Sequence, residues 1–133
     1  RRLSGPLLDR IDITVTVGRP TAAELEQPAV TTTAAAAALV VEAQQRQLAR
    51  TDGVLNARLT AGALRTLACA GAANEVLRRA YRGGLLSPRG KDRVLRVART
   101  IADLDGAPAI ASNHMLEALA LRRDLHHDQA AVA

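Results

Sequence analysis

The sequence predicts a mainly α-helical domain, with about five helices, preceded by one β-strand. Three observations support this class. After residue 30, apolar residues recur at helical spacing between recognisable helix starts and ends. Strict alternation of apolar and polar residues is convincing in one place, residues 11–17. Aromatic residues make up 1% of the 133 residues, and a core of Leu, Val, Ile and Ala favours closely packed helices.

The predicted strand covers residues 11–17. Its apolar members are all β-branched, namely Ile11, Ile13, Val15 and Val17. A single strand has no ladder partner for its backbone N–H and C=O groups. We therefore expect this strand to belong to the sheet of a preceding domain. A turn at Ser4-Gly5-Pro6 precedes the strand, and the Gly and Pro residues between 18 and 28 indicate a linker after it.

The helices are predicted from their capping residues and stop signals. Ser87-Pro88 is the clearest start, because Ser is a favoured N-cap and Pro fits the first helical position. We expect Cys69 to be buried in the second helix. The expected helices run from Thr31, Thr32 or Thr33 to about Arg50, from Thr60 to about Ala70, from Asn74 to Arg82, from Ser87 to about Asp105, and from the cap Ser112 to about residue 124.

The composition excludes several classes of protein. One cysteine leaves no internal disulfide framework and no Cys-based zinc site. No apolar run approaches the roughly 20 residues that span a bilayer, and no secretory segment follows Arg1. We expect part of a longer cytoplasmic protein, with no membrane partner and no metal site. The formal charge is +5, and all but one of the 18 basic residues are arginine. Arginine binds phosphate bidentately, although GC-rich coding would give the same composition.

No complete catalytic motif is present in the chain. It has no phosphate-binding Gly-rich loop with Lys, no Ser/His/Asp or Cys/His arrangement, and no paired carboxylates that stand out. The candidates that remain are arginines. Arg10 lies between a Gly-Pro turn and the predicted strand, where it is placed to reach a phosphate of a neighbouring subunit. The alternative is an ordinary ion pair with Asp9 or Asp12.

A second group of arginines shares one side of the helix that starts at Ser87. Arg96, Arg93 and Arg89 fall on the same stripe at about 100° per residue. Because like charges repel one another, such a stripe favours a bound anion. The alternative is a solvated face that is partly neutralised by Asp92 and Asp103.

Two long stretches resemble the magnesium-chelatase-like AAA+ ATPases, and most closely their ComM-like (YifB-like) branch. They are Leu3-Ser-Gly-Pro-Leu-Leu-Asp-Arg-Ile-Asp-Ile13 and Leu86-Ser-Pro-Arg-Gly-Lys-Asp-Arg-Val-Leu-Arg-Val-Ala-Arg-Thr-Ile-Ala-Asp-Leu104. Shorter matches occur at 47–50, 55–57 and 114–122, so the resemblance spans residues 3 to 123 in order. Pro88 stands where the family often has alanine, and an early helical proline is sterically compatible.

The resemblance implies a domain organisation and three site residues. Residues 1–18 would be the last segment of an AAA+ core, 19–29 a linker, 30–124 the C-terminal helical lid and 125–133 a flexible tail. Arg10 would be the arginine finger that reaches the γ-phosphate of ATP in the neighbouring subunit. Arg96 would be the sensor-2 arginine that contacts ATP in its own subunit, and Arg93 is the competing assignment.

The resemblance also implies cofactors and partners. ATP and Mg²⁺ would serve the full-length parent, and we expect neither to bind stably to this chain, which should be inactive alone. The partners would be its own ATPase core, the neighbouring subunits of a homo-oligomeric ring, and DNA. Three alternatives stay open: the ATPase subunit of a magnesium chelatase, a basic helical module that binds DNA directly, and a plain helical interaction domain. Neither a helix-turn-helix signature nor an aromatic stacking platform favours direct DNA binding.

Overall fold

The computed structural model describes the backbone of residues 10–28 and 31–130, and the side chains of these residues up to Arg122. This part of the chain is mainly helical, as predicted, and contains no regular β-strand. It forms six α-helices and one short 3₁₀ helix: α2 (Ala22–Glu26), α3 (Thr33–Arg50), η1 (Asn56–Arg58), α4 (Ala61–Arg65), α5 (Gly71–Arg82), α6 (Pro88–Leu104) and α7 (Ser112–Ala130).

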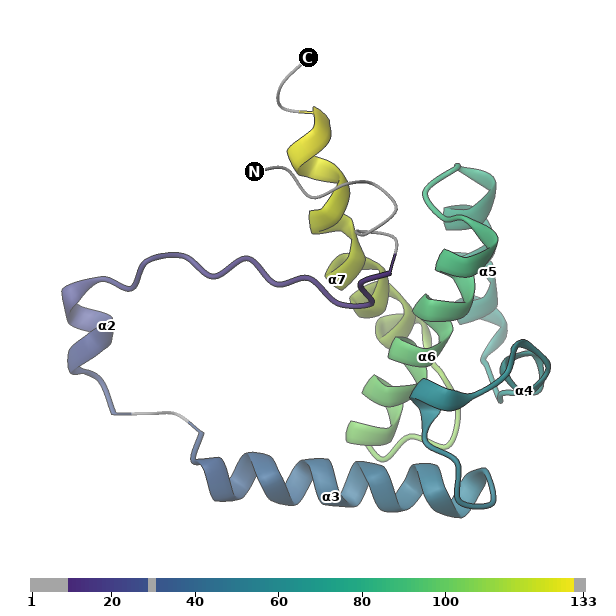
Figure 1. Cartoon of the computed structure of the whole chain (residues 1–133), viewed down its shortest axis with the longest axis horizontal. Coiled ribbons are helices and arrows are strands. Elements are labelled where there is room, and N and C mark those ends of the chain that lie inside the picture. Colours follow the sequence, from purple (N-terminus) through teal and green to yellow (C-terminus); the bar gives the residue numbers. More distant parts are fainter. Residues whose placement is uncertain (1–9, 29–30, 131–133) are drawn as a thin grey trace.

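Helix α6 is the centre of the helical body. It packs against α7 and α3, and also contacts η1, α4 and α5, while α5 packs against α7 (Figure 1). Small and branched aliphatic side chains fill the space between these helices. The largest contribution is from α6, through Val94, Leu95, Val97, Ala98 and Ile101; the other core members are Leu59, Leu64, Ala73, Leu77, Ala80, Leu86, Ile110, Met115 and Ala118.

The start and end of α6 agree with the sequence prediction. The Ser87 side chain accepts a hydrogen bond from Gly90 N–H at 3.0 Å, and Pro88 occupies the first turn. The helix ends at Leu104, and Gly106 then adopts a positive φ of 68°, which a residue without a Cβ reaches at no steric cost. Thr32 caps α3 and Thr60 caps α4 in the same manner as Ser87.

Several helix boundaries differ from the prediction. Helix α5 begins at Gly71 and not at Asn74, and α7 continues to Ala130 and does not end near residue 124. Helix α4 ends at Arg65 instead of near Ala70, because residues 68–70 leave the helix to pair with Ile110. Cys69 therefore forms an isolated parallel bridge with Ile110 and is only partly buried. Ser112 is the first residue of α7 rather than its cap. The side chain of His114 performs the capping role, since its Nδ1 accepts a hydrogen bond from Ala111 N–H at 3.0 Å.

The segment predicted as a strand is extended but has no sheet partner among the described residues. Ile13, Val15 and Val17 are exposed, the last at 85%. Ladder bonds are missing here because this part of the chain supplies no second strand, so the place of this segment in the sheet of a core domain stays a prediction. The predicted linker contains one feature that was not foreseen, the short helix α2, which Thr21 and Glu24 cap reciprocally.

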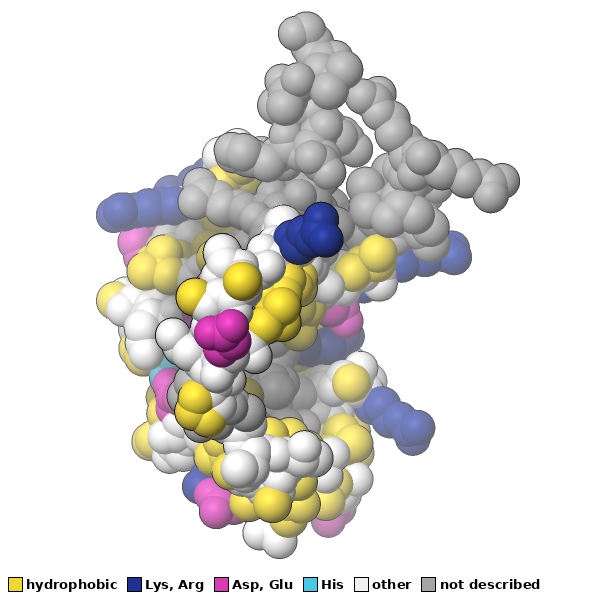
Figure 2. Space-filling model, turned by 90° about the vertical axis from the view of Figure 1, so that its left-hand side faces the viewer, with side chains coloured by type: hydrophobic (Ala, Val, Ile, Leu, Met, Phe, Trp, Pro, Cys, Tyr) yellow, Lys and Arg dark blue, Asp and Glu magenta, His cyan; other side chains and the backbone are white. Residues whose placement is uncertain are grey.

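Helix α3 is anchored at one end only. Ala43 and Gln47 are its buried residues, whereas residues 33–42 are exposed throughout. The helix lies across the lower end of the body and extends away from it beneath α2 (Figure 1). Seen from the side of α2, hydrophobic side chains are prominent on the exposed part of α3, and the basic side chains lie mainly toward the edges of the view (Figure 2). Leu39, Val40 and Val41 are each about half exposed.

Candidate functional site

The structure brings two of the three predicted site residues together. The guanidinium of Arg93, on α6, donates a hydrogen bond through Nη1 to the backbone oxygen of Arg10 at 2.6 Å. The same Nη1 lies 2.5 Å from Oδ1 of Asp12, with which Arg93 forms an ion pair. The side chain of Arg10 is exposed and makes no hydrogen bond within the described part of the chain. The alternative pairing of Arg10 with Asp12 is therefore not formed, and Asp9 lies outside the described residues.

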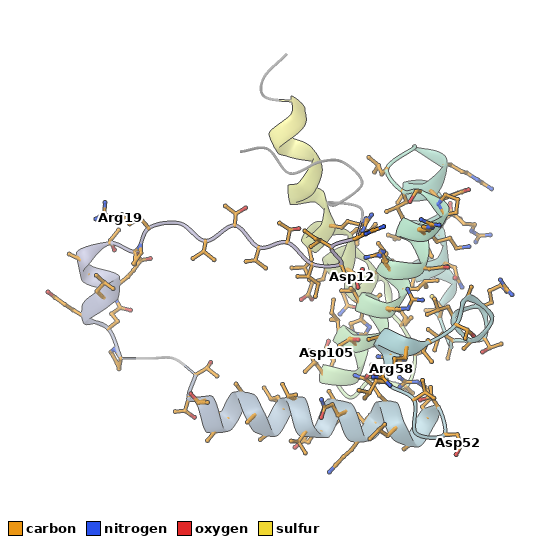
Figure 3. All side chains as sticks on the ribbon, in the orientation of Figure 1. Asp12, Arg19, Asp52, Arg58 and Asp105 are labelled. Atoms are coloured by element: carbon orange, nitrogen blue, oxygen red, sulfur yellow. The ribbon has the colours of Figure 1, made fainter. Side chains whose placement is uncertain are left out.

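Helix α7 also contacts the same segment. Arg122 donates through Nη1 to the backbone oxygen of Ile11 at 3.3 Å. Thr14 N–H donates to the backbone oxygen of Leu121 at 2.8 Å. Asp12 lies beside α6 and α7 in Figure 3, whereas Arg19 lies far from the helical body, near α2. Residues 10–14 are therefore docked on α6 and α7, and the chain leaves the body after them.

Arg96, the third predicted site residue, lies one turn after Arg93 and turns toward a different part of the molecule. Its Nη2 donates to the backbone oxygen of Leu59 at 2.8 Å. Its Nε is buried and has no hydrogen-bond partner among the described residues. A buried guanidinium N–H without a partner is uncommon and calls for an explanation. Arg96 thus keeps hydrogen-bonding capacity that its own surroundings do not use.

Arg89 and Asp103 were both considered for the solvated face of α6, and the structure places them differently. Arg89, in the first turn of α6, is exposed. Asp103, which was predicted to neutralise a solvated arginine face, is instead 1% exposed and faces the interior. For Asp103 this alternative was wrong, because Arg50 of α3 and Arg99 of α6 bind its carboxylate and remove it from the surface.

Asp103 is the centre of a buried polar cluster that joins α3 to α6. Arg50 donates to both carboxylate oxygens of Asp103, at 2.6 Å and 2.9 Å. Asn56 Nδ2 donates to Oδ2 at 2.8 Å, and Arg99 Nη2 donates to Oδ1 at 3.0 Å. Arg99 also donates to the backbone oxygens of Ala107 and Pro108, at 2.6 Å and 3.2 Å. Four donors from three side chains therefore satisfy one carboxylate away from water.

The environment of Asp103 lowers the pKa of its carboxyl group. Burial acts in the opposite direction and is the largest single influence, because it disfavours the charged form. The hydrogen bonds from Arg50 and Asn56, together with the positive charges of Arg99 and Arg50, outweigh it. Asp103 is therefore a carboxylate at neutral pH, and the cluster is ionic.

This cluster was missed as a unit from the sequence, although parts of it gave a signal. Arg50 and Asn56 both lie in the short stretches that resemble the family. Arg99 precedes Asp103 by four residues, the spacing at which helical side chains form ion pairs. The partnership of Arg50 with Asp103 joins residues that are 53 positions apart, and no local pattern indicates it.

The described residues offer no group of three or more His, Cys, Asp or Glu side chains that could hold a metal ion. Within the same part of the chain, no helix is both long and apolar enough to cross a membrane. Among the arginines that the sequence singled out, Arg10, Arg89 and Arg96 form no ion pair in the described part of the chain, so their guanidinium groups could meet an anion. Since arginine cannot act as a proton acceptor in proteins, these residues could bind and stabilise a phosphate but not serve as a general base.

The sequence of this helical body is similar to those of known proteins. Residues 30–122 match the family described as magnesium chelatase, subunit ChlI C-terminal. The match covers more than half of the chain, which belongs to this family.

Similar proteins match over a wider range of the chain. YifB of Escherichia coli is 34% identical over 127 residues, which is 91% of this chain and 24% of that protein. Rv2897c of Mycobacterium tuberculosis is 36% identical over 126 residues, 92% of this chain and 25% of that protein. The competence protein ComM of Haemophilus influenzae is 34% identical over 124 residues, with shares of 91% and 24%. The chain therefore spans about a quarter of the length of these curated relatives.

Proposed function

We propose that this chain is the C-terminal lid of an ATP-hydrolysing AAA+ ring motor of the magnesium-chelatase-like, ComM type. The parent would act on DNA during recombination or transformation. Membership of the magnesium chelatase C-terminal family and similarity to a competence protein support this proposal. The catalytic core, with its phosphate-binding loop, would lie in the part of the relatives that this chain does not match.

The observation that carries the proposal is the state of Arg10. Its backbone is held by the lid helix α6 through Arg93, while its side chain is exposed and unused by the described part of the chain. An arginine that serves an adjacent subunit needs this combination, because its backbone must be fixed and its guanidinium must project outward. Negative charge builds up on the phosphate oxygens during phosphoryl transfer, and a positioned arginine that meets this charge is worth about 10³–10⁵ in rate.

Arg96 is the proposed nucleotide sensor of the same subunit. Its Nε lacks an acceptor but is buried, so a phosphate oxygen would reach it only after the side chain reorients on nucleotide binding. Arg93, the competing residue, has both of its contacts within residues 10–12. ATP would bring Mg²⁺ and the transferable phosphoryl group, and the residues of this chain would contribute the positive charge around them.

The test uses the full-length parent and measures ATP turnover and nucleotide binding separately. Arg10→Ala should lower turnover by about 10³-fold or more and leave nucleotide binding nearly unchanged, because a finger acts on the transition state of a neighbour. Arg96→Ala should weaken both quantities. Arg82→Ala, which removes an exposed arginine from α5, is the control for loss of charge. Arg93→Ala and Arg89→Ala complete the series and would reveal a sensor elsewhere on α6.

Mixed rings separate action on a neighbour from action within one subunit. Each variant is combined with a partner subunit whose phosphate-binding loop is defective. Arg10→Ala keeps an intact nucleotide site, so the partner's intact finger should restore turnover there. Arg96→Ala lacks a group that its own site needs, and the same partner should not rescue it. Normal turnover by Arg10→Ala in an assembled ring would show that Arg10 is not a finger.

A further inference from the structure

We propose that Arg93 and Arg122 are positioning residues that fix Arg10 by holding the backbone around it. Together with the backbone oxygen of Leu121, they form what we term the clasp, the set of contacts that docks residues 10–14 on α6 and α7. The clasp would carry a movement of the lid helices to Arg10. The existence of the clasp is independent of the proposed function, while its consequence for catalysis rests on that function.

The contact of Arg93 is made to the backbone of Arg10 and not to its side chain. Nη1 of Arg93 lies 2.6 Å from the Arg10 carbonyl oxygen and 2.5 Å from the carboxylate of Asp12. One guanidinium thus contacts both residue 10 and residue 12. These two contacts restrain the position and the orientation of the segment. The carboxylate of Asp12 balances the charge of Arg93, and the guanidinium of Arg10 stays available for another anion.

The contacts from α7 add a second helix to the clasp. Arg122 reaches the carbonyl oxygen of Ile11 at 3.3 Å, and Leu121 accepts the Thr14 N–H at 2.8 Å. Ile11 and Thr14 are the partly buried residues of the stretch from 10 to 20, and the others are exposed. The docking is therefore confined to residues 10–14 and does not extend along the predicted strand.

Arg122 is itself buried between α7 and the first turn of α6. It is 4% exposed, and a Cβ added at Gly90 would lie 3.3 Å from its Nη2. The side chain therefore passes from α7 across the first turn of α6, where the absence of a side chain at residue 90 leaves room for it. A planar guanidinium packed in this way loses little further freedom when it binds a carbonyl oxygen.

The clasp connects the two arginines of the proposed function. Arg96 follows Arg93 by one turn of the same helix, so a rigid displacement of α6 moves both residues together. If Arg96 binds the nucleotide of its own subunit, the clasp delivers the resulting shift of α6 to Arg10, which serves the next subunit. Arg93 would then act through Arg10 and would not touch the nucleotide itself.

The clasp can be tested in the 133-residue chain without ATP, by hydrogen exchange of single backbone amides followed by NMR. The Thr14 amide reports on docking, because its acceptor is on α7. Arg93→Ala should speed its exchange by about three- to tenfold, the modest effect expected of partly exposed charged contacts. The exchange of Ala98 and Ile101, in the core of α6, should not change. Arg82→Ala should leave all three amides as in the natural chain. Unchanged exchange at Thr14 in Arg93→Ala, with the core intact, would overturn the clasp.

The consequence for catalysis is tested in the full-length parent. Arg93→Ala should lower the kcat for ATP with little change in nucleotide binding, as a positioning residue does. The double variant Arg10→Ala/Arg93→Ala should turn over no more slowly than Arg10→Ala alone, since both changes disable the same group. Weaker nucleotide binding in Arg93→Ala would instead make Arg93 the sensor and overturn this role. If Arg10→Ala is fully active, the finger assignment fails, while the exchange of Thr14 still decides whether the clasp exists.

Discussion

Asp103→Asn should lower the free energy of unfolding at neutral pH by about 3 kcal/mol. The carboxylate accepts two hydrogen bonds from Arg50, one from Asn56 and one from Arg99. An asparagine keeps one acceptor oxygen and turns an NH₂ group toward an arginine. Removal of one partner from a buried ion pair costs about 3–5 kcal/mol. The lower end applies here, because Arg50 is 27% exposed and can rehydrate, and Arg99 keeps its bonds to two carbonyl oxygens.

Urea denaturation followed by far-ultraviolet circular dichroism measures this difference. Asp52→Asn is the matched control, since it makes the same chemical change at an exposed residue. Asp52 has a positive φ of 50°, a conformation that asparagine adopts readily, so its substitution should shift stability by less than about 0.5 kcal/mol. If Asp103→Asn were as stable as Asp52→Asn, the polar cluster would contribute nothing net, and its role in joining α3 to α6 would have to be abandoned.

The same residue sets an expected dependence on pH. The pKa of Asp103 is lowered in the folded state, so between that value and the unfolded value of about 3.9 only the unfolded chain is protonated. The unfolded state then binds more protons, and stability falls as the pH falls through this window. The stability conferred by the charged form is complete above about pH 5. The difference in the free energy of unfolding between the natural chain and Asp103→Asn should therefore become smaller as the pH is lowered. A difference that stays constant down to pH 3 would contradict this reasoning.

Three other features lend themselves to simple measurements. Ser87→Ala removes the acceptor for Gly90 N–H and should cost about 1 kcal/mol in urea denaturation, and an unchanged midpoint would show that the cap is not needed. His114→Ala removes the acceptor for Ala111 N–H at the start of α7, and a loss of about 1–2 kcal/mol is expected in the same assay; full stability would mean that water replaces the imidazole. Burial raises the pKa of the Cys69 thiol, so its alkylation near pH 8 should be slower in the folded chain than in denaturant. Equal rates would disagree with its partial burial.

Local signals in the sequence predicted the helices well and the polar contacts poorly. The cap at Ser87, the stop at Gly106 and the apolar spacing of α6 depend on neighbours a few residues away, and all three agree with the structure. The burial of Asp103 depends on Arg50, which reaches it from another helix. Periodicity sorts residues into apolar and polar faces and treats every charged residue as exposed. It therefore fails where charges satisfy one another inside the protein.

The shortening of α4 has a similar origin. Alanine-rich sequence favours continuation of the helix beyond Arg65, but pairing of residues 68–70 with Ile110 supplies hydrogen bonds from a distant loop. For the candidate site, the sequence indicated which arginines to consider, and the structure added their contacts. That Arg93 holds the carbonyl oxygen of Arg10, 83 positions away, follows from the packing of the fold and from no motif.

The one-sided anchorage of α3 has a thermodynamic consequence. Near Gln47 and Arg50 the helix can open only if the junction with α6 also opens, so these turns share the cooperativity of the whole body. The arm from residue 33 to 42 is exposed throughout, and its helicity is maintained by alanine propensity and by the Thr32 cap. A single helix therefore spans a gradient of local opening free energy, from nearly zero at its first turn to that of global unfolding at its last. Heating should melt it progressively from residue 33 toward the junction before the body itself unfolds.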